Sequence, residues 1–180
     1  NDGGIGISRD RGKTWVFDEK IPAGQFYHIN VDNELPYNVM GGMQDNGSWL
    51  GPAYTWTNGG IRNYYWSNIG GGDGFDAMPD PNGDGWAYSM SQGGSVGRVN
   101  YKTGERWNIR PPYLGKDEKN IYRFNWNAAI AQDPFNKNTI YYGSQHVHKS
   151  TDKGVSWETI SPDLTTNDSA KIDQSTTGGL

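Results

Sequence analysis

The chain of 180 residues contains no cysteine. This absence excludes disulfide bonds, thiol catalysis and zinc sites built from cysteine. Long apolar runs are also missing, and no stretch approaches the roughly 20 residues of a membrane-spanning helix. The 16 basic residues are fewer than the 20 acidic ones, and they are scattered singly. A phosphate-binding surface needs a basic stripe, so we expect neither a nucleic-acid partner nor a membrane span.

Helical periodicity is absent as well. No window keeps apolar residues at positions i, i+3, i+4 and i+7 over three turns. The chain has instead 26 glycines, 8 tryptophans and 11 tyrosines. Short stretches such as 141–147 run between turn signals, as strands do. The composition therefore predicts an all-β protein with many short strands and tight turns.

One eight-residue pattern occurs twice, at 8–15 and at 150–157, and both copies read Ser-x-Asp-x-Gly-x-Ser/Thr-Trp. We expect a hairpin in which aspartate accepts backbone N–H groups and glycine supplies a positive φ. The hydroxyl residue bonds back locally, and the tryptophan packs beneath the turn. The expected structural residues are Ser8, Asp10, Gly12, Trp15, Ser150, Asp152, Gly154 and Trp157.

This pattern resembles the Asp-box, or BNR repeat, of a β-propeller family that includes sialidases, xyloglucan hydrolases and sortilin-type receptors. Further segments look like parts of large exported bacterial proteins called glycosyl hydrolases or sortilin-like BNR proteins. These segments are 41–49, 70–76, 91–94, 123–127 and 161–165, so the resemblance covers essentially the whole chain. It implies four-stranded antiparallel blades, export from a bacterial cell, and boxes that lie at the blade periphery, away from the ligand.

The spacing of other residues fits such a repeat. The two boxes begin 142 residues apart, which is room for about three units of roughly 40–50 residues. Gln44, Gln92 and Gln145 end similar stretches at steps of 48 and 53 residues. Aspartate turns at residues 32, 80 and 133 precede these stretches, and a degenerate box at 102–107 keeps the glycine and the tryptophan.

We therefore predict a partial propeller of about three and a half to four blades. The expected units are 1–21, which is partial, then 24–68, 69–112 and 121–164, with a linker or the start of another blade at 165–180. The chain begins and ends inside the repeat pattern, so we expect the remaining blades of a parent polypeptide as partners. Closure as a four-bladed propeller is the alternative.

Carboxylates in glycine-rich segments are the catalytic candidates. A glycosidase of the usual kind needs two carboxyl groups roughly 5–10 Å apart. Asp73 and Asp76 form the best pair, and Asp45 is a third candidate. Aspartate and glycine are also what β-turns require, so a structural role is the alternative. A sialidase mechanism is disfavoured, because no arginine spacing identifies the trio that binds the substrate carboxylate.

The repeated glutamines are the candidates for ligand binding. Equivalent strand ends would place their amides around a channel mouth, where they would bind hydroxyl-rich ligands. Bonds to a neighbouring blade's backbone are the alternative. The full set of candidate ligand-binding residues is Gln44, Gln92, Gln145, Asn125, Trp126 and Trp49.

Metal patterns are incomplete. Asp80, Asn82 and Asp84 match the first half of a calcium loop, but its twelfth position is Ser91 instead of glutamate. His146 and His148 share one face of a strand without a third zinc ligand nearby. His28 is isolated in the sequence. We therefore expect no cofactor, with calcium as a weak candidate.

Taken together, the sequence predicts an exported propeller module that binds a glycan or a protein segment. Part of a glycoside hydrolase is the first alternative. A scaffold that docks a partner protein is the second.

Overall fold

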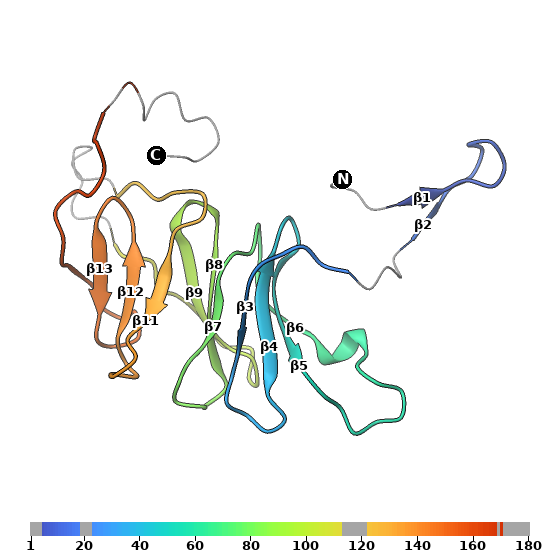
Figure 1. Ribbon diagram of the computed structural model, residues 1–180, viewed down its shortest axis with the longest axis horizontal. Coiled ribbons are helices and arrows are strands. Elements are labelled where there is room, and N and C mark those ends of the chain that lie inside the picture. The colour runs from blue at the N-terminus through green and yellow to red at the C-terminus, as the bar shows by residue number, and fades with distance from the viewer. Residues whose placement is uncertain (1–4, 19–22, 113–121, 169, 171–180) are drawn as a thin grey trace.

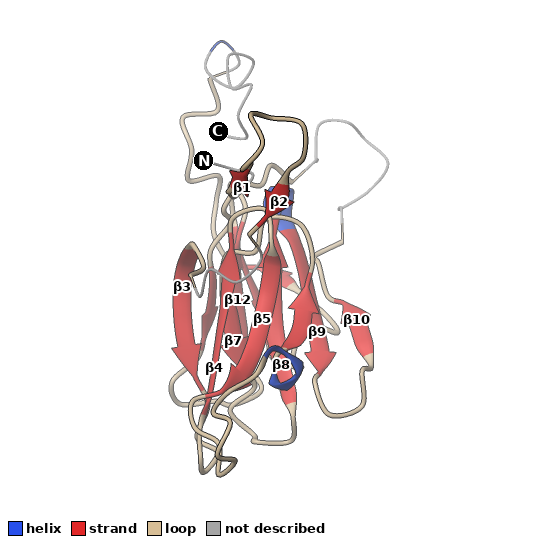
Figure 2. Cartoon of the chain, turned by 90° about the vertical axis from the view of Figure 1, so that its right-hand side faces the viewer, coloured by secondary structure: helices blue, strands red, loops and turns tan. Residues whose placement is uncertain are grey.

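The structure, a computed structural model, describes residues 5–18, 23–112, 122–168 and 170. Its ordered elements are short strands and two single turns of 3₁₀ helix, η1 (Asn63–Tyr65) and η2 (Gln92–Gly94) (Figure 2). The strands are β1 (Gly6–Ile7), β2 (Val16–Phe17), β3 (Phe26–Val31), β4 (Asn38–Met43), β5 (Gly47–Pro52), β6 (Ser67–Gly70), β7 (Ala77–Pro79), β8 (Trp86–Ser91), β9 (Ser95–Asn100), β10 (Arg106–Asn108), β11 (Ile130–Gln132), β12 (Ile140–Gly143), β13 (Val147–Ser150) and β14 (Glu158–Thr159). Within these residues, no helix has the length and apolar character to cross a membrane.

The strands form consecutive antiparallel meanders. Three sheets have four strands each, and we name them the first sheet (β3–β6), the second sheet (β7–β10) and the third sheet (β11–β14). Strands β1 and β2 form a separate N-terminal hairpin. The three sheets lie side by side, with the hairpin beyond the first sheet (Figure 1). Such meanders are propeller blades, so the prediction of an all-β partial propeller is confirmed.

One boundary between predicted units differs from the structure. The division placed between residues 68 and 69 falls inside β6, and the first sheet continues to Gly70. Ile69 is 1% exposed, and its carbonyl accepts a 2.7 Å hydrogen bond from the Ser89 hydroxyl. Burial against the second sheet therefore extends this strand past the predicted boundary.

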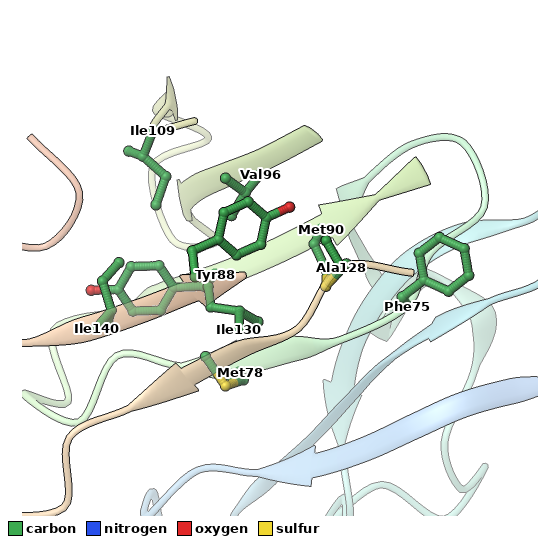
Figure 3. Close-up of a cluster of buried hydrophobic side chains, with 10 residues drawn as sticks. Phe75, Met78, Tyr88, Met90, Val96, Ile109, Ala128, Ile130 and Ile140 are labelled. Atoms are coloured by element: carbon green, nitrogen blue, oxygen red, sulfur yellow. The ribbon is translucent and has the colours of Figure 1, made fainter. Parts of the chain in front are cut away.

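Two apolar cores hold the sheets together. The core between the first and second sheets contains Met40, Leu50, Ile69, Ala77, Ala87 and Val99. The core between the second and third sheets contains Phe75, Met78, Tyr88, Met90, Val96, Ile109, Ala128, Ile130, Ile140 and Tyr142 (Figure 3). Each large side chain buried in this way stabilises the fold by about 1.5–3 kcal/mol. The faces of neighbouring sheets are thereby fixed against each other.

Gly42 on β4 allows a close approach between the first sheet and the segment that leads into β7. A Cβ atom at this position would lie 2.2 Å from the carbonyl carbon of Gly74. The N–H group of Gly42 donates to the carbonyl of Phe75 at 3.1 Å. This segment, which carries two of the candidate carboxylates, is therefore held against the first sheet.

The second copy of the repeated pattern has the hydrogen bonds expected of the hairpin. Asp152 Oδ1 accepts the Ser156 N–H at 2.8 Å and the Ser150 hydroxyl at 2.7 Å. Ser150 Oγ in turn accepts the Gly154 N–H at 2.7 Å, and Gly154 has a φ of +92°. The carboxylate and the hydroxyl together satisfy the backbone groups of this turn.

The first copy repeats this arrangement. Thr14 N–H donates to Asp10 Oδ1 at 2.8 Å, and Gly12 N–H donates to Ser8 Oγ at 2.7 Å. The hydroxyl and N–H of Thr14 lower the pKa of Asp10 to about 2. Two segments that are far apart in the chain thus form the same type of turn.

The tryptophans of the pattern do not all pack as expected. Trp157 lies against the core of the second and third sheets, and its Nε1–H donates to the Ile109 carbonyl at 2.8 Å. Trp15 is 67% exposed, so the expected packing is wrong for this residue within the described part of the chain. Trp107 of the degenerate copy is 51% exposed and donates to Glu105 at 2.7 Å. Among these three tryptophans, Trp157 is the one that packs against a core between two sheets.

Asp152→Ala is expected to lower the free energy of unfolding by about 1–2 kcal/mol, because it leaves the Ser156 N–H and the Ser150 hydroxyl without their acceptor. Urea denaturation measures this change. Asp10→Ala is the matched control in the N-terminal hairpin, and we expect it to leave the unfolding midpoint of the sheets unchanged. Equal losses in both variants would contradict the link between the second box and the sheet core.

Candidate functional site

The three glutamines lie at corresponding places in the three sheets. Gln44 follows β4, Gln92 follows β8, and Gln145 lies two residues beyond β12. The segments that lead into β7 and β11, residues 71–76 and 122–129, reach the same places. We call this region, formed by the three glutamine turns and the two leading segments, the glutamine end.

Two of the glutamines hold backbone segments in place through their side-chain oxygens. Gln92 Oε1 accepts the Asp73 N–H at 2.9 Å, and Gln145 Oε1 accepts the Arg123 N–H at 2.7 Å. Gln145 is only 5% exposed. These bonds hold each leading segment to its own sheet, so the geometry favours the structural alternative for Gln92 and Gln145.

Asp73 connects the first and second sheets. It is 4% exposed, and its Oδ1 accepts the Asp45 N–H at 2.8 Å and the Gln44 amide at 3.2 Å. Its own N–H is held by Gln92 of the second sheet. These contacts favour a structural role for Asp73, because a catalytic carboxylate must reach its substrate.

Asp76 lies at the glutamine end beside His28 of β3. His28 Nδ1 is 2.6 Å from Asp76 Oδ1, and the two side chains are 58% and 14% exposed. The expectation that His28 is isolated is wrong, since residues 48 positions apart meet here. The carboxylate holds Nδ1, so Nε2 is the ring nitrogen that is left to bond another group.

The sequence contains a signal for this pair. His28 pairs with Gly42, two residues before Gln44. The carbonyl of Asp76 accepts the N–H of Met90, which is two residues before Gln92. His28 and Asp76 therefore occupy the same position on the first strands of neighbouring sheets, and counting back from the aligned glutamines would have placed them together.

Other candidate residues lie elsewhere at the glutamine end. The Tyr27 hydroxyl donates to Gln44 Oε1, and the Tyr27 ring lies 4.8 Å from that of Phe75. Asp45 is exposed on its turn with a φ of +58°. Trp126 is 41% exposed, and its carbonyl accepts the Gly93 N–H at 3.4 Å. Its neighbour Asn125 is also exposed. The structure thus brings most of the predicted ligand-binding residues to one end.

Trp49 is the exception. Met40 and Leu50 point into the core between the first and second sheets. Because side chains alternate between the two faces along β4 and β5, Met43 and Trp49 point to the opposite face. There Trp49 lines an open cleft of about 570 Å³ together with Phe26, Met43, Ile61 and Trp66. Its Nε1–H donates to the Asn46 carbonyl at 2.7 Å. This aromatic cleft is a surface separate from the glutamine end.

The calcium candidate Asp80 is surrounded by cationic side chains. It is 3% exposed, and its Oδ2 lies 2.9 Å from Arg98 Nη2 and 3.0 Å from Lys153 Nζ. Asn82 donates to Oδ1 at 2.6 Å, whereas Asp84 is exposed and 3.9 Å from Lys153. Burial acts to raise the pKa of Asp80, but hydrogen bonds from Lys153 and Asn82 outweigh it and lower the pKa. Across the described ranges, no three of His, Cys, Asp and Glu cluster as metal ligands.

His148 is a buried neutral group. It is 1% exposed, with Nε2 2.7 Å from Ser144 Oγ and Nδ1 3.2 Å from Thr159 Oγ1. Burial lowers its pKa to about 4, and the charge of His146 acts in the same direction. These contacts favour packing over zinc binding for this histidine.

Comparison with known proteins gives a distant likeness to a solved structure. No protein-family model matches the sequence, and no curated protein matches it. The structure is similar to the crystal structure of the GH74 xyloglucanase from Xanthomonas campestris, at 15% sequence identity and a TM-score of 0.49. The match covers 90% of this chain and 27% of that enzyme's chain, so this chain spans about a quarter of the enzyme's length. The fold assignment therefore rests on the strand topology itself.

Acid is expected to destabilise the protein through His148. The folded pKa of about 4 lies below the ordinary histidine value of about 6.5, so the folded state binds fewer protons in this window. Stability is complete above about pH 6.5 and falls toward pH 4 by up to about 3 kcal/mol. Denaturant titrations across this range measure the slope. His148→Gln should flatten it, and a variant that kept the wild-type slope would contradict this assignment.

Proposed function

We propose that this chain is the ligand-binding part of an exported Asp-box β-propeller and that its glutamine end binds a glycan. The observation that carries the proposal is the His28–Asp76 pair, 2.6 Å apart, in which the histidine side chain is 58% exposed; the exposed turn of Asp45 lies at the same end of the sheets. The Asp-box assignment is supported by the two equal turns at Asp10 and Asp152. Export is proposed from the family resemblance of the sequence.

A glycan suits this region because sugar hydroxyls both donate and accept hydrogen bonds. Asp76 offers a carboxylate, His28 offers Nε2, and the Asn125 amide offers both a donor and acceptors. Trp126 adds an accessible aromatic face for the apolar side of a sugar ring. A protein segment would need apolar pockets for its side chains, and the residues named here are mostly polar.

A glycoside hydrolase is the second candidate, and the exposure of Asp45 at the same end of the sheets as Asp76 favours it. In this case these two carboxylates would act as the acid and the base, since Asp73 is buried and already accepts two hydrogen bonds. Incubation with a panel of polysaccharides and analysis of reducing ends tests this activity. Hydrolysis that is lost in Asp45→Asn and in Asp76→Asn would support it.

His28→Ala and Asp76→Asn are each expected to weaken glycan binding about ten-fold, the effect of losing one charge-assisted hydrogen bond. Ligands selected on a glycan array and titrated by calorimetry provide the measurement. His28 is 58% exposed, so we expect His28→Ala to keep the melting temperature. Asp76 is 14% exposed, and asparagine keeps its size and its Oδ1 acceptor, so we expect only a small change in Asp76→Asn.

Two further variants serve as controls. Lys137→Ala changes an exposed residue on the turn between β11 and β12, at the other end of the third sheet, and should bind normally. Gln92→Ala removes the acceptor of the Asp73 N–H and should lower the melting temperature. Unchanged affinity in both His28→Ala and Asp76→Asn would contradict the proposed site.

A further inference from the structure

The junction between the second and third sheets includes a pair of polar contacts from one hairpin. Both come from the hairpin that joins β13 to β14. Lys153 Nζ lies 3.0 Å from Asp80 Oδ2, on the turn between β7 and β8. Trp157 Nε1–H donates to the carbonyl of Ile109, just beyond β10. A basic side chain and an indole of one sheet thus contact an acidic turn and a strand end of the preceding sheet.

The junction between the first and second sheets follows the same scheme. The turn between β9 and β10 again contacts the first turn of the preceding sheet. Tyr101 donates to Asp32 Oδ2 at 3.5 Å, and Lys102 Nζ lies 3.4 Å from Glu34 Oε1. In both junctions, therefore, positive charge on the later sheet meets negative charge on the earlier one.

The N-terminal hairpin carries the basic half of this contact, and no acidic half pairs with it among the described residues. Arg11 holds the position of Lys153 in the repeated pattern, and both residues have a φ of +62°. Trp15 holds the position of Trp157 and is 67% exposed. Within the described ranges, Arg11 forms no ion pair. The hairpin therefore presents a cation and an indole in the geometry that the second box uses.

The third sheet carries the acidic half. Asp133 N–H donates to Thr139 at 3.0 Å, as Asp80 N–H donates to Trp86 at 2.8 Å, so the two aspartates occupy equivalent turns. In the described part of the chain, no lysine or arginine nitrogen lies within 4.0 Å of the Asp133 carboxylate. Its Oδ2 accepts only the Tyr141 hydroxyl, at 2.9 Å, among the side-chain bonds described.

Ile160 completes this surface. Its N–H donates to Val147 at 2.9 Å, as that of Ile109 donates to Val96 at 3.1 Å, so Ile160 is the equivalent of Ile109. Ile109 is 4% exposed, whereas Ile160 is 46% exposed. The third sheet therefore has an open counterpart of the surface that receives Trp157.

We propose that the N-terminal hairpin docks on the third sheet of a second copy of this chain and repeats the junction between the second and third sheets. Arg11 then pairs with Asp133, and the Trp15 indole N–H donates to the carbonyl of Ile160. The hairpin and the third sheet lie at opposite ends of the molecule (Figure 1). The basic half on the hairpin of one copy therefore meets the acidic half on the third sheet of another copy. The contact is head to tail, and it joins copies in series.

Sedimentation velocity over a concentration series tests this inference. The mass of the 20.0 kDa chain should rise with concentration, and high salt should weaken the association. Arg11→Glu and Asp133→Asn should each weaken it at least ten-fold, because each removes one member of the charge pair. Asparagine still accepts the turn N–H groups, so the turn of residue 133 remains folded, which circular dichroism verifies.

Mixing the two variants is the decisive experiment. Arg11→Glu retains an intact third sheet, and Asp133→Asn retains an intact hairpin, so an equimolar mixture should form heterodimers. Arg9→Glu is the matched control, because it makes the same charge change at a position whose counterpart, Thr151, forms no bond to the second sheet among the described contacts. A monomer at every concentration, no heterodimer, or equal weakening by Arg9→Glu would overturn the proposal.

Discussion

The buried carboxylate of Asp80 is the interaction on which the stacking of the second and third sheets depends. A carboxylate that is 3% exposed is costly unless charges and hydrogen bonds compensate it. Arg98 supplies one charge from the second sheet itself, and Lys153 supplies another from the third. The pairing therefore sets which turn of one sheet faces which hairpin of the next, while the apolar cores provide most of the burial.

The aspartates of this protein differ in role according to their access to solvent and the origin of their partners. Asp10 and Asp152 each close a turn of their own hairpin. Asp73 and Asp80 are buried and receive partners from a neighbouring sheet, so they join sheets. At the glutamine end, Asp45 is exposed, and Asp76, which is 14% exposed, pairs with the exposed side chain of His28. Sequence alone does not separate these roles, because aspartate beside glycine fits all of them.

What the sequence predicts well is local. The two eight-residue patterns predict their hairpins because all the partners lie within a few residues of each other. Contacts between sheets are harder to predict. His28 and Asp76 meet because each is paired with the residue two positions before the glutamine of its own sheet. The exposure of Trp15 and the continuation of β6 to Gly70 likewise depend on whether another sheet covers the residue. Burial by a neighbour is a property of the assembly of sheets, and the local pattern does not encode it.

We propose that the glutamine end, through His28 and Asp76, recognises a hydroxyl-rich ligand. Nuclear magnetic resonance titration of the isotope-labelled chain with an oligosaccharide tests it most directly, because each backbone amide and the His28 ring report separately. If the glutamine end binds the oligosaccharide, the chemical shifts of residues 27–28, 44–46, 73–76 and 125–126 should change. The signal of His28 Nε2 should change markedly. Shifts confined to the aromatic cleft of Trp49 and Trp66 would contradict it.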